Sequence, residues 1–411
     1  MPILLEEDLQ RPLPRMYRVR QQFDETRLED VAGTVRAELA KPEIRALVKP
    51  GMRIAVGVGS RGIQNLYTIV ETTVNSLKEL GAEPFIVSAM GSHGGGTEEG
   101  QREVLAGYGI TEERLGVPVV TTVDTVYLGN CANGRPVWFD RAAYEADLIV
   151  PINRVKLHTD FVGPIQSGLC KMLVIGLGNH KGCSAVHEEA PEVFADAIEE
   201  TARLILQKAP VGFGIAILEN AYDKTYAVEA VPAEHLVERE KELVQIAKGN
   251  MPYIMLDEAD VIVCGAIGKD ISGAGFDPNI LGRSSVLKQF VLHIPRYQRL
   301  VLCDVTPASH GNGIGVGLFD VITKKVAEQL DLESMYANAI ACNCLGDASV
   351  PCTVDDEETA IRVALKCCRN IDRDHPRIIR IQNTLHLGKI EVSEALLDAV
   401  RADSRMSLIE N

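Results

Sequence analysis

The sequence lacks any long apolar run, and it lacks a segment that resembles a secretory signal. No stretch reaches the length of about 18 apolar residues that a membrane-spanning helix needs. The start of the chain places Glu6 and Glu7 where a signal peptide has a basic region followed by an apolar one. These absences argue against a membrane protein and against secretion, so we expect a cytoplasmic protein.

An excess of basic residues is also missing. The 42 Lys and Arg residues stand against 57 Asp and Glu residues, which gives a formal net charge of −15 at pH 7. A nucleic-acid partner requires concentrated Lys and Arg, so we exclude one. An anionic substrate must therefore meet a local cationic pocket.

The ten cysteines include no C-x-x-C pair, which argues against a zinc finger, an iron–sulfur cluster or a dithiol redox motif. We expect most of these cysteines to be reduced thiols in the core.

Alternating strand and helix patterns indicate an α/β fold with two domains and an active-site cleft between them. We expect a first domain over residues 1–255 and a second over residues 256–411, with the last helix packing back on the first domain. The polar stretch at residues 249–252 is typical of such a boundary. The main strands are predicted at residues 53–58, 84–89, 117–123, 148–152, 173–175, 212–218, 259–265, 299–304 and 377–381, and the main helices at 63–80, 97–107, 190–208, 318–329 and 357–367.

One glycine motif imitates a dinucleotide site. Residues 57–62 read G-x-G-x-x-G between a predicted strand and a predicted helix. The acidic residue that should end the next strand is missing, because that strand runs into Gly91, Ser92 and His93. A guanidinium at Arg61 suits an anionic ligand better than close packing, so we do not predict nicotinamide binding.

Two histidines follow predicted strands. His93 comes after the strand at residues 84–89, while Lys156 and His158 come after the strand at residues 148–152. Side chains at the carboxyl ends of parallel strands face ligands. If these ends are adjacent, the two imidazoles face each other across a substrate, as a two-base mechanism requires. The alternative is that each histidine caps a loop or bonds to backbone.

Five elements follow one another along the chain. They are an arginine loop at Arg61, a Gly-Ser-His loop at His93 followed by Thr-Glu-Glu, a later His158, a Gly-x-x-Lys segment from Gly168 to Lys171, and His187 beyond it. Their order resembles that of the nickel-dependent lactate racemase superfamily, whose members carry a nickel-pincer nucleotide. The loop that usually reads Asp-His-Thr-Arg is Val-Gly-Ser-Arg here, which indicates a divergent member.

The resemblance implies a role for each matching residue. Lys171 would carry the cofactor covalently, His187 would bind nickel with His180 as the alternative, His93 and His158 would be the catalytic bases, and Arg61 would orient the substrate. Ser60, Gly94, Gly95 and Gly168 would contact the cofactor. The implied activity is that of an isomerase, a racemase or epimerase of an α-hydroxy acid or aldonate that works by hydride transfer.

The second domain matches the family less clearly. We select Lys269 as the substrate-facing lysine, with Arg283 as the second choice, and expect His310 in the glycine-rich segment at residues 306–317 to line the cleft. The implied partners are a small hydroxy acid and the cofactor-synthesis enzymes, while a homo-oligomer is left open.

Two other classes of protein stay open. A metal hydrolase would use His158, His180 and His187 as ligands, although their spacings of 22 and 7 residues match no standard zinc motif. A non-catalytic sugar-acid binding protein would need the cationic clamp but not Lys171.

Overall fold

The computed structural model describes residues 3–60 and 62–410. The chain divides into two compact α/β units, as the alternation of strand and helix predicts. Unit 1 consists of Met1–Phe23 and Pro252–Asn411, and unit 2 of Asp24–Met251. The change of unit at Met251 agrees with the boundary expected from the polar stretch. Unit 1 also contains the first 23 residues, so the expected first domain of residues 1–255 was wrong at its start.

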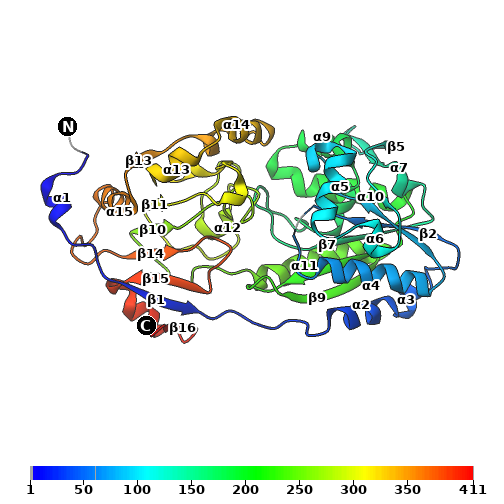
Figure 1. The fold of residues 1–411 in the computed structure, drawn as a ribbon, viewed down its shortest axis with the longest axis horizontal. Coiled ribbons are helices and arrows are strands. Elements are labelled where there is room, and N and C mark those ends of the chain that lie inside the picture. The colour runs from blue at the N-terminus through cyan, green and yellow to red at the C-terminus, as the bar shows by residue number, and fades with distance from the viewer. Residues whose placement is uncertain (1–2, 61, 411) are drawn as a thin grey trace. The chain divides into compact units, whose positions relative to one another are not determined.

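Unit 2 is built on a six-stranded sheet with the order β4-β3-β2-β7-β8-β9 and a separate two-stranded ribbon, β5-β6. Figure 1 shows β2, β7 and β9 of the sheet and β5 of the ribbon. Its strands are β2 (Arg53–Val58), β3 (Glu83–Ser88), β4 (Val119–Val120), β5 (Thr125–Asn130), β6 (Pro136–Asp140), β7 (Leu148–Arg154), β8 (Phe213–Glu219) and β9 (Thr225–Pro232). Its helices are α2 (Val31–Leu39), α3 (Pro42–Arg45), α4 (Leu66–Glu79), α5 (Glu98–Gly107), α6 (Glu112–Leu115), α7 (Arg141–Tyr144), α8 (Leu169–Lys171), α9 (Asn179–His187), α10 (Phe194–Lys208) and α11 (Leu236–Asn250).

The topology of the unit 2 sheet fixes where a ligand site can form. Strands β4, β3, β2, β7 and β8 are parallel, and β9 pairs antiparallel with β8. From β2 the chain proceeds to β3 on one side and later to β7 on the other, so the strand order reverses at β2. Open parallel sheets bind ligands outside the carboxyl ends of the strands at such a switch point.

The two faces of this sheet are covered differently. Ile54, Val56 and Val58 alternate along β2 and pack with the apolar side chains of α2 and α4. Gly57 lies on the opposite face, where an added Cβ would come 3.8 Å from Leu177. The segment that carries the Gly-x-x-Lys motif therefore covers the second face.

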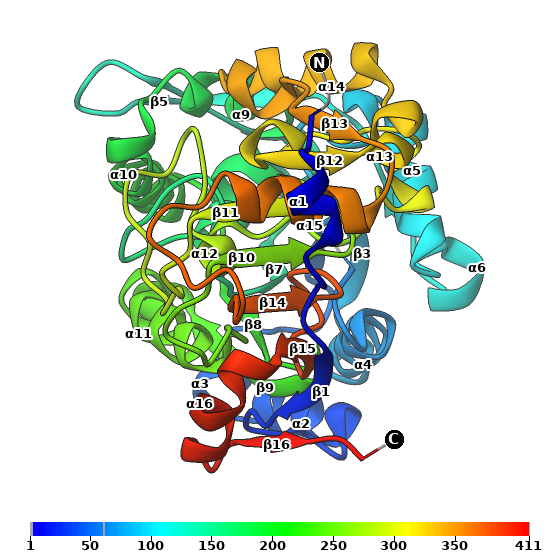
Figure 2. The same cartoon turned by 90° about the vertical axis from the view of Figure 1, so that its left-hand side faces the viewer.

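Unit 1 has an eight-stranded sheet with the order β13-β12-β11-β10-β14-β15-β1-β16. Figure 2 shows these strands following one another, with the N-terminal β1 between the C-terminal β15 and β16. The strands are β1 (Met16–Gln21), β10 (Val261–Cys264), β11 (Arg299–Leu302), β12 (Val321–Thr323), β13 (Cys352–Val354), β14 (Ile378–Ile381), β15 (Lys389–Ser393) and β16 (Met406–Leu408). The helices are α1 (Glu6–Gln10), α12 (Pro278–Leu281), α13 (Lys324–Gln329), α14 (Leu332–Ala341), α15 (Glu357–Lys366) and α16 (Leu397–Ala402).

Several expected elements differ from the structure. The predicted strand at residues 173–175 was wrong, because Met172–Gly176 forms a π-helical segment between α8 and α9. The predicted helix at 318–329 begins only at Lys324, after strand β12. The last helix, α16, buries Leu397 and Val400 in the core of unit 1, which also contains Val19 of the N-terminal strand. Among the described residues, no helix has the length and apolar character that crossing a bilayer requires.

Candidate functional site

Three neighbouring strands of unit 2 end at the candidate site. Ser60 follows β2, His93 follows β3 and His158 follows β7. The two histidines were expected at adjacent strand ends, but β2 lies between β3 and β7, so their strands are not neighbours. Strands in a sheet are about 4.8 Å apart, so the two strand ends are separated by roughly 10 Å.

The loop that carries His93 is fixed by hydrogen bonds to a buried glutamine. Gln101 of α5 is fully buried, accepts a hydrogen bond from the Ser88 hydroxyl at 2.6 Å and donates one to the Gly91 carbonyl at 3.0 Å. The His93 ring is exposed, and its Nδ1 is hydrogen-bonded to the Ser60 hydroxyl. Ser60 therefore orients the His93 imidazole in this structure. The Tyr108 hydroxyl holds the backbone of Ser60 by donating to its carbonyl at 2.9 Å.

His158 lies in a closed loop after β7. The ends of this loop pair through backbone hydrogen bonds between Lys156 and Ser167. The buried Gln166 accepts a hydrogen bond from the His158 backbone N–H at 2.8 Å. The Asp160 backbone N–H donates to Nδ1 of His158 at 3.0 Å, which fixes the orientation of the ring.

Lys171 contacts His158 directly. Its Nζ is hydrogen-bonded to Nε2 of His158. Lys171 ends the short helix α8, which covers the second face of the sheet, and it is half-buried. Helical structure continues after Lys171, where the sequence predicts a strand at residues 173–175. The contact with His158 agrees with a shared site.

The turn before Lys171 is fixed on two sides. Asn153, at the end of β7, donates to the Gly168 carbonyl at 2.8 Å. Glu240 of α11 accepts from the Cys170 backbone N–H at 2.8 Å. Glu240 is fully buried, and this burial raises the pKa of its carboxyl group to about 7. A Cβ at Gly168 would lie 2.6–2.8 Å from the carboxyl atoms of Glu240, so the buried Gly168 faces this carboxyl group.

Helix α9 carries both candidate metal ligands. The Nδ1 of His187 donates to the Cys183 carbonyl at 2.7 Å, so Nε2 is the ring nitrogen left to present a lone pair. The hydrogen bond with the Cys183 thiol raises the pKa of His187, although burial and the charge of Lys171 oppose this. Burial opposes ionisation of Cys183, but hydrogen bonds from His187 and Ser92 lower the pKa of its thiol.

Aromatic contacts connect His158 with His187. The His158 ring stacks on Phe161 with ring centroids 4.3 Å apart. Phe161 contacts Phe194 at 4.8 Å, and Phe194 contacts His187 edge-on at 5.1 Å. His187 is thus linked to His158 by packed rings and to Lys171 by charge. The rival ligand, His180, lies instead beside Gly96 of the His93 loop, where an added Cβ would come 3.8 Å from the His180 Cβ.

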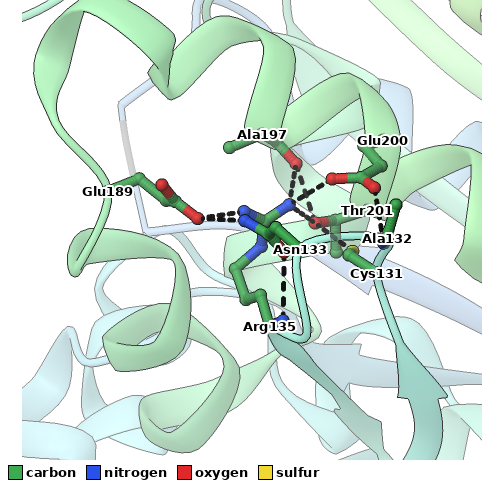
Figure 3. A network of polar contacts seen from close by, with 8 residues as sticks. All are labelled: Cys131, Ala132, Asn133, Arg135, Glu189, Ala197, Glu200 and Thr201. Carbon is green, nitrogen blue, oxygen red and sulfur yellow. Dashed lines mark hydrogen bonds and ion pairs between the residues drawn. The ribbon is translucent and has the colours of Figure 1, made fainter.

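A buried arginine holds the connection between α9 and α10 (Figure 3). Arg135, at the β5-β6 ribbon, forms ion pairs with Glu189 and with Glu200, the latter at 2.9 Å. It also donates to the Ala197 carbonyl and the Thr201 hydroxyl, each at 3.2 Å. The Arg135 network therefore fixes the segment between His187 and Phe194.

The remaining predicted residues are placed as follows. Arg61 lies outside the described residues. Gly94 and Gly95 belong to the His93 loop, both with left-handed backbone, and no atom lies within 4 Å of a Cβ added at Gly95. In unit 1, Lys269 donates through Nζ to the Gly273 carbonyl at 2.8 Å. Arg283 forms an ion pair with Asp320 at 2.6 Å, and His310 ends a short turn.

The residues present can be tested against the cofactor that the resemblance implies. Within the described part of the chain, no group of three or more His, Cys, Asp and Glu residues is placed to hold a metal ion. A protein-only zinc site needs three or four such ligands, so the hydrolase alternative gains no support. A metal held mainly by an organic cofactor needs only one imidazole. His187, with Nε2 available and Lys171 near, fits that requirement.

Comparisons with known proteins show what parts of the chain are similar to. Residues 11–196 match the model of the lactate racemase N-terminal domain. The chain is similar to the lactate racemase apoprotein from Thermoanaerobacterium thermosaccharolyticum, with 13% identity, a TM-score of 0.53 and coverage of 89% of this chain and 93% of that chain. It is also similar to a structural-genomics protein from Thermotoga maritima, with 14% identity, a TM-score of 0.49 and coverage of 80% and 85%. No curated protein sequence matches the chain.

The segment at residues 11–196 therefore matches the lactate racemase N-terminal domain, which agrees with the resemblance seen in the order of its motifs. The matched segment contains Ser60, His93, His158, Lys171 and His187. The two-domain α/β fold agrees with that of the lactate racemase apoprotein. The match of this segment supports a racemase or epimerase type of function.

The supporting residues gave no signal in the sequence. Gln101, Asn153, Gln166 and Glu240 each stand next to other polar residues, so the local pattern does not distinguish them from solvent-facing ones. Only their burial and their hydrogen bonds to site backbone reveal them.

Proposed function

We propose that this protein is a racemase or epimerase of a small α-hydroxy acid or aldonate that works with a nickel-pincer nucleotide attached to Lys171. The observation that carries the proposal is the contact between Lys171 and His158 at the switch point of the unit 2 sheet, with His93 two strands away along the same edge. The family match of the segment that holds all three residues supports it.

The proposed mechanism assigns one imidazole to each side of the carbinol carbon. His93 or His158 takes the hydroxyl proton as the carbon is oxidised, and the histidine on the other side returns a proton when the opposite enantiomer forms. Imidazole can both accept and donate a proton near neutral pH, so either direction is accessible. When bound, the nickel-pincer nucleotide supplies the hydride acceptor.

The remaining residues bind and orient. Arg61 would hold the substrate carboxylate with a bidentate pair. Lys171 would anchor the cofactor, with Ser60, Gly94 and Gly95 beside it. His187 would present Nε2 to nickel, since its Nδ1 is engaged by the Cys183 carbonyl. Lys269 of unit 1 is proposed as a second substrate contact.

Isotope incorporation during inversion tests the proposal. Protein co-expressed with the cofactor-synthesis enzymes is incubated with single enantiomers of α-hydroxy acids and aldonates in deuterated water. We expect inversion of at least one compound, with little deuterium at the inverted carbon, because the hydride returns to the carbon it left. Complete deuteration there would indicate direct α-proton abstraction and would contradict the hydride route.

Variants test the assignment of the bases in the same assay. His93→Ala and His158→Ala should each lower interconversion by at least about 100-fold, because general acid–base catalysis contributes that much. His235→Ala is the control, since His235 is exposed at the start of α11. Binding of a sugar acid without any inversion by cofactor-loaded protein would favour a binding protein instead.

A further inference from the structure

Glu240 reaches the site from a helix that is 70 residues away in sequence from the turn it contacts. Its carboxyl group accepts from the backbone N–H of Cys170 at 2.8 Å, and the Leu169 N–H and the Cys170 thiol also act on it by lowering its pKa against the effect of burial. These are the two residues that precede Lys171. Its Oε1 is buried and makes no hydrogen bond to the described residues. The contacts of this carboxyl group are thus concentrated on the first turn of α8.

Gly168 is matched to this carboxyl group. The φ of Gly168 is −179°, which is extended backbone that any residue adopts, so the conformation does not require glycine. A Cβ at this position would instead come 2.6 Å from Cδ of Glu240 and 2.7 and 2.8 Å from its two oxygens. Gly168 of the Gly-x-x-Lys motif is therefore needed because a side chain there would occupy the space of the Glu240 carboxyl group.

Capping a helix with a buried carboxyl group carries an unfavourable free energy of burial. A Ser, Thr or Asp at residue 168 would satisfy the same backbone N–H groups from the surface of the turn. Burial of a carboxyl group with one unsatisfied oxygen is unfavourable by comparison. What the remote residue adds is a rigid link between α11 and the turn that aims Lys171.

We propose that Glu240 is a positioning residue for Lys171, and that it holds the α8 turn so that the lysine amine stays beside His158 for attachment of the cofactor. This inference rests on the proposed function, in which Lys171 is the anchor. Asn153 holds the same turn from strand β7. The position of the Lys171 amine is thereby fixed by one hydrogen bond from the sheet and one from α11.

Acylation of Lys171 in cofactor-free protein tests this link without turnover. The full-length chain is treated with N-hydroxysuccinimide acetate, and labelling of each lysine is followed by peptide mass spectrometry, with the exposed Lys208 as internal reference. Glu240→Ala should let the turn open and raise the Lys171 rate by about tenfold, as expected for the loss of a helix cap. Glu240→Gln keeps one acceptor oxygen and should stay within about twofold of the unsubstituted protein.

Two further variants separate positioning from general destabilisation. Gly168→Ala should reproduce the effect of Glu240→Ala, because its Cβ displaces the carboxyl group. In the Glu240→Ala background, Gly168→Ala should raise the Lys171 acylation rate little further, since the space for its Cβ is then free. Leu243→Ala removes another buried side chain of α11 and should leave the Lys171 rate unchanged. An unchanged rate in both Glu240→Ala and Gly168→Ala, or an equal rise in Leu243→Ala, would overturn the proposal.

Cofactor attachment provides the second readout. Among proteins co-expressed with the cofactor-synthesis enzymes, the fraction with a modified Lys171 should fall in Glu240→Ala and be retained in Glu240→Gln. If the unsubstituted protein carries no adduct, the proposed function fails. The acylation rates still decide whether Glu240 positions Lys171.

Discussion

At the scale of single residues, the available ring nitrogen distinguishes the two candidate nickel ligands. His187 has Nδ1 engaged by the Cys183 carbonyl and is connected to His158 through Phe161 and Phe194. His180 lies beside the His93 loop instead. These placements favour His187 because its Nε2 is oriented by a second hydrogen bond, as is usual for metal-binding histidines.

Metal analysis checks this choice. Holoprotein with His187→Ala should lose most of its nickel, because one imidazole is the protein's contribution to the site, while His180→Ala should retain it. Nickel measured by mass spectrometry against protein concentration gives the result, and circular dichroism controls for folding. Retention of nickel in His187→Ala together with its loss in His180→Ala would reverse the assignment.

The ionisation of Glu240 predicts a dependence of stability on pH. Burial raises the pKa of the folded carboxyl group from 4.5 to about 7. The folded state therefore holds a proton that the unfolded state releases, and the contribution of Glu240 to stability is lost as pH rises from about 4.5 to 7. The loss amounts to about 3 kcal/mol at most.

Urea unfolding at several pH values measures this contribution. Glu240→Gln cannot ionise, so the stability of the variant relative to the unsubstituted protein should improve steadily between pH 5 and pH 7.5. Curves that stay parallel over this range would show that Glu240 is ionised in the folded protein throughout.

Residues with recognisable motifs were predictable at this scale, whereas their supports were not. His93, His158 and Lys171 stand out because glycines and strand ends surround them. Gln101 and Glu240 lie within polar stretches of their helices, so they look like residues of an exposed helix face. Their hydrogen bonds come from strand and turn backbone that only tertiary packing brings near.

At the scale of secondary structure, the central strands of both sheets were predicted and the segment around Lys171 was not. Strands β2, β3 and β7 are short apolar runs between turn residues. The run at residues 173–175 has the same character but lies in the π-helical segment Met172–Gly176. A short buried apolar run does not distinguish strand from helix, because both bury it completely.

The Arg135 network predicts how firmly the α9–α10 connection is held. Arg135 is 7% exposed and pairs with Glu189 and Glu200. Removing one member of a buried ion pair leaves the others unsatisfied. Arg135→Ala should therefore lower the free energy of unfolding of unit 2 by about 3 kcal/mol.

An exposed arginine provides the matched control. Arg203 has a side chain that is 46% exposed, and it pairs with Glu199 and Glu238. Arg203→Ala should cost less than about 1 kcal/mol, because solvent screens such pairs. Equal losses for the two variants in urea unfolding would mean that Arg135 contributes no more than a surface ion pair.

At the scale of the whole molecule, the pairing partners of the first strand, β1, could not be predicted from the sequence. Strand β1 pairs with β15 and β16, which are more than 360 residues further along the chain. Local patterns of hydrophobicity carry no information about so distant a partner. The α/β class and the change of unit near Met251 were predictable because alternating elements and a polar boundary are local features.

Removal of residues 1–23 tests this arrangement. The truncated protein should expose the edges of β15 and β16, so hydrogen exchange should accelerate in both strands. Exchange in β2 and β7 of unit 2 should stay as in the full chain. Unchanged protection of β15 would show that β1 contributes nothing to the sheet of unit 1.

The central claim is that Lys171 anchors a nickel-pincer nucleotide, and peptide mass spectrometry of holoprotein tests it most directly. Protein co-expressed with the cofactor-synthesis enzymes in the presence of nickel is digested, and every lysine peptide is weighed. We predict an added mass of nucleotide size on the Lys171 peptide, none on Lys156, and no adduct in Lys171→Ala. An unmodified Lys171 in protein that inverts a hydroxy acid, or an adduct on another lysine, would contradict the account.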